Sequence, residues 1–138
     1  MKVLTRDVII LKSIEETTQI LKSCAYHFPK ATFTESTFSM HCPKRRNGGV
    51  LSLIHIKGSF FKDKENTKVI LKIHANLYFA IGCLMIFGGL IGLIYSLLLD
   101  VISWPFYLGA ILLGLLASGQ FIGESSELLD LLEHKLTR

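Results

Sequence analysis

Cysteine and histidine occur as two short pairs early in the chain, Cys24 with His27 and His41 with Cys42. Thiolates and imidazoles are preferred zinc ligands, and structural zinc sites often use two such pairs. Adjacent residues on a strand point to opposite faces, so His41 and Cys42 are not expected to bind one ion. A Cys/His nucleophile pair would also need an orienting group and an oxyanion site, and no motif supplies them. We therefore expect no metal, no cofactor and no catalytic residue, and a protein that is not an enzyme.

The most compact basic cluster is Lys44, Arg45 and Arg46, directly before the turn signal Asn47-Gly48-Gly49. It is either a solvated loop or a contact for lipid headgroups or an acidic partner, because each basic side chain near an anionic membrane adds about 1 kcal/mol. Nucleic acid usually requires a broad basic face with aromatic platforms. Membrane lipid or protein is therefore the expected partner, and nucleic acid is not.

Residues 75–122 are almost entirely apolar, and Asp100 is their only charged residue. Crossing a hydrocarbon core of about 30 Å takes about 20 residues of helix. The pattern predicts a transmembrane helical hairpin with spans at about 76–99 and 105–122 and a turn at 100–104. Asp100 is expected to be an ordinary interfacial carboxylate. Aromatic residues at the ends of the spans are typical interfacial anchors, here Tyr78, Trp104 and Tyr107.

Small residues recur at every fourth position in both predicted spans. This spacing places them on one helix face and lets two backbones approach closely. We predict that the spans pack against each other through Gly88, Gly92 and Ser96 in the first and Ala110, Gly114 and Ser118 in the second. Alternatively, one stripe packs against a neighbouring subunit, for which Gly82 and Gly89 offer a second small patch.

Residues 1–74 predict a small α+β domain. A first strand over 2–11 precedes Ser13-Ile-Glu-Glu16, a capping box that opens an amphipathic helix ending at Pro29. Apolar and polar residues then alternate, which predicts strands at 37–42, 50–57 and 67–74, with Gly58–Asn66 as a hairpin loop. The order β-α-β-β-β suggests a small antiparallel sheet with a helix on one face.

The segment 123–138 follows the second span, and Gly123 is expected to break the helical pattern there. Its leucines recur on one side, which predicts a C-terminal amphipathic helix docked on the sheet. A helix lying on the lipid surface is the alternative. The acidic polar face of this segment disfavours it, because anionic lipids attract basic faces.

Charge asymmetry predicts the orientation. Residues 1–74 contain thirteen Lys and Arg against six Asp and Glu, an excess of seven. Positive charge near membrane ends marks the cytoplasmic side. We therefore expect a multi-pass protein of the bacterial cytoplasmic (inner) membrane, with both termini in the cytoplasm.

With about seventy-five residues outside the spans before the hairpin, a full catalytic domain has little room. The sequence favours an anchored interaction, accessory, regulatory or immunity-type subunit that contacts a protein partner or other copies of itself through the cytoplasmic domain. One alternative is a self-assembling membrane effector that perturbs or permeates the bilayer. A second alternative is a small enzyme at the cytoplasmic leaflet.

Overall fold

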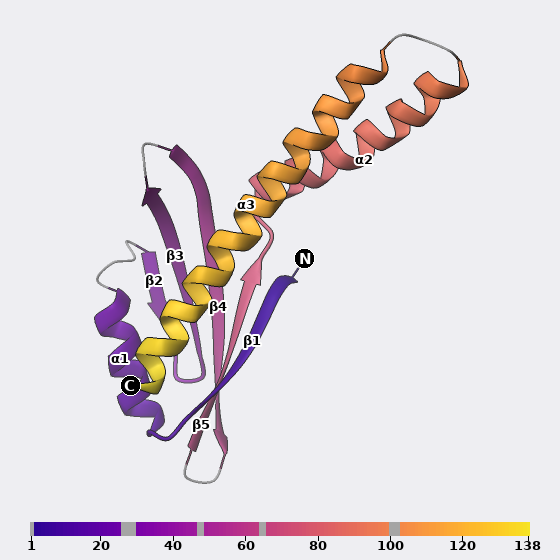
Figure 1. Cartoon of the computed structure of the whole chain (residues 1–138). Coiled ribbons are helices and arrows are strands. Elements are labelled where there is room, and N and C mark those ends of the chain that lie inside the picture. The colour runs from indigo at the N-terminus through magenta and orange to yellow at the C-terminus, as the bar shows by residue number, and fades with distance from the viewer. Residues whose placement is uncertain (1, 26–29, 47–48, 64–65, 100–102) are drawn as a thin grey trace. The chain divides into compact units, whose positions relative to one another are not determined.

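The computed structural model describes residues 2–25, 30–46, 49–63, 66–99 and 103–138. Within them the protein is α+β, with a five-stranded antiparallel sheet and three helices (Figure 1). Contacts divide the chain into two compact units. One contains Met1–Asn76 and Glu124–Arg138, and the other contains Leu77–Gly123.

The sheet has the strand order β1-β5-β4-β3-β2. Strands β2 to β5 follow one another as a meander, and β1 pairs with β5, so α1 connects one edge of the sheet to the other. The strands are β1 (Lys2–Ile10), β2 (Lys30–Phe33), β3 (Thr37–Arg46), β4 (Gly49–Asp63) and β5 (Asn66–His74).

One face of the sheet forms the core. In β5 burial alternates along the whole strand, and Val69, Leu71 and Ile73 are fully buried. Helix α1 (Ile14–Ala25) and the C-terminal part of α3 (Trp104–Thr137) cover this face (Figure 1). The other buried apolar residues of this unit are Val8, Ile10, Leu21, Cys24, Phe38, Met40, Ile54, Ile56, Phe60, Leu129, Leu132 and Leu136.

The predicted capping box is confirmed at the start of α1. The backbone N–H of Glu16 donates to the Ser13 hydroxyl at 3.2 Å, and the N–H of Ser13 donates to the Glu16 carboxylate at 3.4 Å. These two bonds satisfy amide groups that have no partner within the helix. The cap therefore fixes where α1 begins, and Thr17 and Leu21 then face the core.

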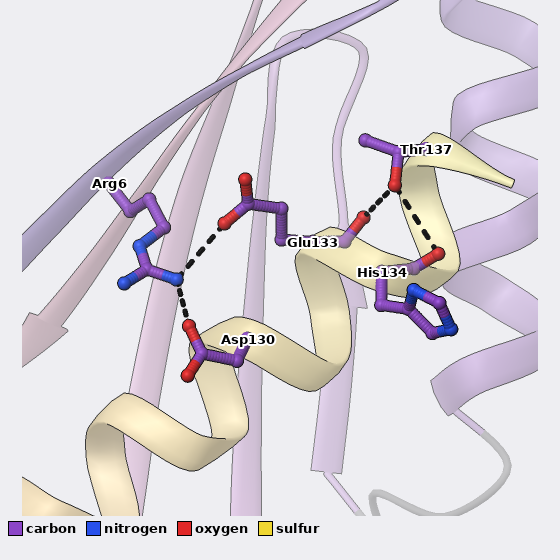
Figure 2. A network of polar contacts seen from close by, with 5 residues as sticks. All are labelled: Arg6, Asp130, Glu133, His134 and Thr137. Carbon is purple, nitrogen blue, oxygen red and sulfur yellow. Dashed lines mark hydrogen bonds and ion pairs between the residues drawn. The ribbon is translucent and has the colours of Figure 1, made fainter.

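A charged contact joins β1 to the C-terminal part of α3 (Figure 2). One guanidinium nitrogen of Arg6 contacts the carboxylates of both Asp130 and Glu133, the latter at 3.0 Å. These ion pairs raise the pKa of Arg6, chiefly through its hydrogen bond with Asp130. At the end of the same helix the Thr137 hydroxyl donates to the carbonyls of Glu133 and His134.

The element order differs from the sequence prediction in the sheet. The structure is β-α-β-β-β-β, because Lys30–Phe33 adds a short edge strand that pairs with β3. The segment Gly58–Asn66, predicted as a loop, continues the ladder: β4 runs to Asp63 and β5 begins at Asn66. The charge of Lys62 is tolerated within the ladder because its side chain is exposed near the end of β4.

Helix α3 also differs from the prediction, because it continues through Gly123 to Thr137 without interruption. A single glycine costs a helix only about 1 kcal/mol relative to alanine. Burial of Leu129, Leu132 and Leu136 further along stabilises the continued helix. The predicted break is therefore wrong, whereas the amphipathic pattern beyond it is present.

The second unit is a helical hairpin made of α2 (Leu77–Leu98) and the first part of α3. Both helices are long and apolar enough to cross a membrane. Large apolar side chains point outward along them, including Leu84, Phe87, Ile91, Phe106 and Leu116. Phe79, next to the predicted anchor Tyr78, packs against Phe121 with ring centroids 5.2 Å apart.

The two hairpin helices approach each other at glycine. A Cβ added to Gly82 would lie 2.6 Å from the Ser118 hydroxyl, and one added to Gly114 would lie 2.6 Å from the carbonyl oxygen of Gly82. A Cβ added to Gly89 would lie 2.6 Å from the side chain of Ile111. The buried small residues of α2 are thus Gly82, Gly89 and Ser96, which are seven residues apart.

The observed contact agrees only in part with the predicted stripe of small residues. Gly114, Ser118 and Ser96 are buried, Gly92 is covered by the Tyr107 ring, and Ala110 is half-buried. Gly88 is exposed, and a Cβ there would meet none of the described atoms within 4 Å. Residues seven apart lie on the same face of a helix two turns apart, so Gly82, Gly89 and Ser96 form one line of contact.

Gly58→Ala should destabilise the sheet by about 1–3 kcal/mol, the usual cost of overpacking a core. Gly58 faces the core, and its missing side chain leaves room for the ring of Phe38, which an added Cβ would overlap. Phe38 cannot easily move because it also contacts Phe33 and Phe60. Chemical unfolding in detergent measures the loss. Ser59→Ala, on the opposite face, is the control, and an equal effect there would contradict the assignment.

Gly114→Ala should lower the unfolding midpoint in detergent relative to Gly88→Ala. Both changes gain about 1 kcal/mol of helix propensity, so the comparison isolates the clash with the backbone of α2, which is present only at Gly114. Equal midpoints would show that the hairpin is not packed through Gly114.

Candidate functional site

The face of the sheet opposite α1 and α3 is the open face. Side chains alternate along a strand, so the neighbours of the buried residues point to it. Its basic residues are Lys2, Lys30, Lys57, Lys68 and Lys72, joined by His41, His55 and His74. Hydroxyl side chains fill much of the rest: Thr5, Thr32, Thr37, Ser39 and Ser59. Among the strand side chains that the structure describes, Asp7 is the only carboxylate on this face.

Three imidazoles, here called the histidine row, cross the open face. His55 is paired in register with His41 on one side and His74 on the other. The His41 and His55 rings stack with centroids 4.1 Å apart, and the His55 and His74 centroids are 6.0 Å apart. The Nδ1 atoms of His41 and His74 are buried without a partner among the described residues.

Lys57 and Lys72 lie next to the histidine row and directly opposite each other. Like charges at directly opposite positions are destabilising. None of the described carboxylates forms an ion pair with either lysine. Lys68, on the same strand as Lys72, behaves differently, because its ammonium lies 2.9 Å from the Asp7 carboxylate. Of the five lysines on the open face, only Lys68 therefore has a carboxylate partner among the described residues, and the facing pair Lys57 and Lys72 has none.

A hollow of about 420 Å³ lies over this part of the open face. Its cationic lining residues are Lys2, Lys57, Lys72 and His74, which come from β1, β4 and β5. Hydroxyl-bearing residues of β2, β3 and β4 complete its polar wall, namely Thr32, Thr37, Ser39 and Ser59. Volumes of about 300–1,000 Å³ are typical of small-molecule sites.

Burial and the charge of the open face both lower the pKa of two imidazoles, His55 and His74. Burial lowers the pKa of His55 from its usual value, and the positive charges of His41 and Lys57 lower it further. Burial also lowers the pKa of His74, with the charges of Lys57 and Lys2 acting in the same direction. Both shifts mean that the folded protein disfavours added positive charge here.

The chemistry available on the open face is anion binding. Ammonium groups, hydroxyls and imidazoles can donate hydrogen bonds, and three lysines, several hydroxyl side chains and the His74 imidazole line one hollow. Among the described residues, no three His, Cys, Asp or Glu side chains are placed so that they could hold one metal ion, the histidine row included. Cys24 is buried in α1 on the core side, His41 lies on the open face, and His27 lies outside the described residues, so the two pairs considered for zinc are not shown to converge.

The open face also contains a serine–histidine contact. The Ser39 hydroxyl and His55 Nε2 are 2.7 Å apart. In catalytic pairs a carboxylate or amide orients the second ring nitrogen, and an oxyanion site lies nearby. Here the neighbours of the His55 ring are imidazoles and lysines. The contact therefore positions His55 and lacks the remaining parts of a hydrolytic site within the described residues.

The predicted contact residues Lys44, Arg45 and Arg46 lie at the end of β3, where its backbone pairs with β4. Their side chains lie outside the described part of the chain, as does Asp100. Of the predicted interfacial anchors, Trp104 is exposed, Tyr78 is half-buried, and Tyr107 covers Gly92 within the hairpin.

The histidine row and its lysines were not identified as a site from the sequence, although a signal for them exists. His55-Ile-Lys57 and Lys72-Ile-His74 are mirror images, one near the middle of β4 and the other at the end of β5. Two such segments in adjacent antiparallel strands place histidine opposite histidine and lysine opposite lysine. The sequence cannot supply the register that makes this pairing.

Comparison of the chain with protein-family models, curated proteins and solved structures finds no match.

Acidification should destabilise the sheet unit. His55 and His74 have a lower pKa in the folded state than the ordinary value of 6.5, so the unfolded chain binds more protons near that pH. Their contribution is complete above pH 6.5 and is lost as the pH falls below it. Unfolding midpoints measured at and below pH 6.5 should decrease as the pH falls. His55→Gln should reduce the slope of the midpoint against pH. An unchanged slope in the variant would contradict this account.

Proposed function

We propose that this chain is a membrane-anchored, non-enzymatic interaction subunit whose open sheet face contacts an acidic partner. One observation supports this most directly. The open face presents five lysines and three histidines against a single described carboxylate, while α1 and α3 cover the opposite face. A sheet that needed only to be soluble would mix both signs of charge.

The anchor in this proposal is the hairpin. Its outward apolar side chains suit hydrocarbon better than water, since burying a large apolar side chain is worth about 1.5–3 kcal/mol. The segments on both sides of the hairpin belong to one folded unit, Met1–Asn76 with Glu124–Arg138. A hairpin that crosses the membrane twice leaves its two flanking segments on the same side, where they can fold together as one unit. The basic excess of the N-terminal part favours the cytoplasm.

The binding mode in this proposal is electrostatic. Complementary charge steers partners together and selects among them more than it adds raw affinity. The uncompensated pair Lys57 and Lys72 lies on central strands, so its backbone is held on both sides by the sheet. A rigid cationic surface of this kind suits an acidic protein surface near the membrane.

Photo-crosslinking in cells tests the proposal. A photoreactive residue at Thr5, exposed on the open face, should give an adduct with a second protein. One at Gln19, exposed on α1, should not. Lys57→Glu with Lys72→Glu should reduce the Thr5 adduct about tenfold, because repulsion replaces attraction. Lys135→Glu, an exposed site on α3, should leave it unchanged.

Two outcomes would contradict the proposal. Equal adducts from Thr5 and Gln19 would show that the open face is not selective. Adducts between copies of this chain that form only from the exposed hairpin residue Leu84 would favour the self-assembling membrane effector. Dye leakage from vesicles would then be the next measurement.

A further inference from the structure

The hollow over Lys57 and Lys72 has a more specific composition than the rest of the open face. It gathers three lysines and His74 on one side and hydroxyl side chains on the other. Lys68, by contrast, is not among its lining residues and is neutralised by Asp7. None of the basic residues that line the hollow forms an ion pair with a described carboxylate.

This arrangement has an energetic cost in the absence of a ligand. Lys57 and Lys72 face each other across adjacent strands, and Lys2 is in register with His74 beside them. Repulsion of this kind is relieved when an anion lies between the charges. The pKa of His74 is lowered chiefly by burial, and the charges of Lys57, Lys2 and Lys72 lower it further.

The hydrogen-bond donors that line the hollow suit a phosphoryl group better than a carboxylate. A carboxylate offers two oxygens in one plane, whereas a phosphoryl group offers three, which spread over a wider solid angle and accept bonds from several directions. Lysine binds phosphate as a point charge, and hydroxyl donors such as Ser59 of β4 and Thr32 of β2 add directional bonds. The hollow is also large enough for more than the phosphoryl group itself.

We propose that this hollow binds the phosphoryl group of a small phosphorylated ligand or of an anionic phospholipid, held by Lys57, Lys72 and Lys2 with hydroxyl donors from β2 and β4. The inference rests on the proposed function, because it takes the open face as the binding surface. It adds the ligand chemistry and its position. The two sources share this chemistry and are separated by the experiment.

The test uses the full chain in nanodiscs of phosphatidylcholine, titrated calorimetrically with inorganic pyrophosphate. Binding is expected, and Lys57→Gln or Lys72→Gln should weaken it about tenfold, as loss of one charge-assisted hydrogen bond does. Lys68→Gln is the matched control, because it removes the same charge from the same face and strand but outside the hollow. Unfolding midpoints of the three variants confirm that each is folded.

A second arm identifies the source of the phosphoryl group. If the ligand is a phospholipid headgroup, nanodiscs that contain phosphatidylglycerol should compete and weaken pyrophosphate binding. If it is a soluble molecule, the affinity for pyrophosphate should be the same in both nanodiscs. Either result supports the phosphoryl site.

Three results would overturn the inference: no binding of pyrophosphate, an equal loss in Lys68→Gln, or equally tight binding of a glutamate polymer. The last would indicate a surface that selects charge without selecting phosphate. This experiment needs no partner protein, so its failure is separable from that of the proposed function. If pyrophosphate does not bind but the Thr5 adduct forms, only the phosphoryl site is contradicted. If pyrophosphate binds but no Thr5 adduct forms, only the acidic protein partner is contradicted.

Discussion

The register between β4 and β5 sets the chemistry of both faces of the sheet. It places Ile56 beside Ile73 on the core side and, on the other side, His55 opposite His74 and Lys57 opposite Lys72. Each fully buried aliphatic side chain contributes about 1.5–3 kcal/mol, whereas like charges at opposite positions cost a fraction of 1 kcal/mol. A slip of one residue would bring lysines into the core. Core packing therefore determines the register, and the cationic pair follows from it.

The sheet unit and the hairpin are stabilised by different kinds of packing. In the sheet unit a helix is held by leucines and by the contacts of Arg6 with Asp130 and Glu133. In the hairpin nearly every side chain is apolar, so burial of apolar area does not select a face, and small residues decide where backbones meet. Helix α3 belongs to both units and changes from one pattern to the other without a break.

Several elements could be predicted because their signals are local. The capping box at Ser13, the alternation in β5 and the length of the apolar segment each depend on a few neighbouring residues. The short edge strand β2 and the extension of β4 could not be predicted in this way, because they exist through pairing with β3 and β5. Gly88 was chosen from spacing alone, and only the crossing of two helices shows that Gly82 and Gly89 make the contact.

The sequence by itself determined the α+β character of the sheet unit, the apolar hairpin segment and the basic excess of the first 74 residues, since composition and periodicity are properties of a single chain. Tertiary structure alone decided which basic residues act together. Lys2, Lys57, Lys72 and His74 come from three strands and meet only because β1 and β4 pair on either side of β5. The physical reason is that side-chain alternation assigns a residue to a face, whereas register between strands assigns it a neighbour.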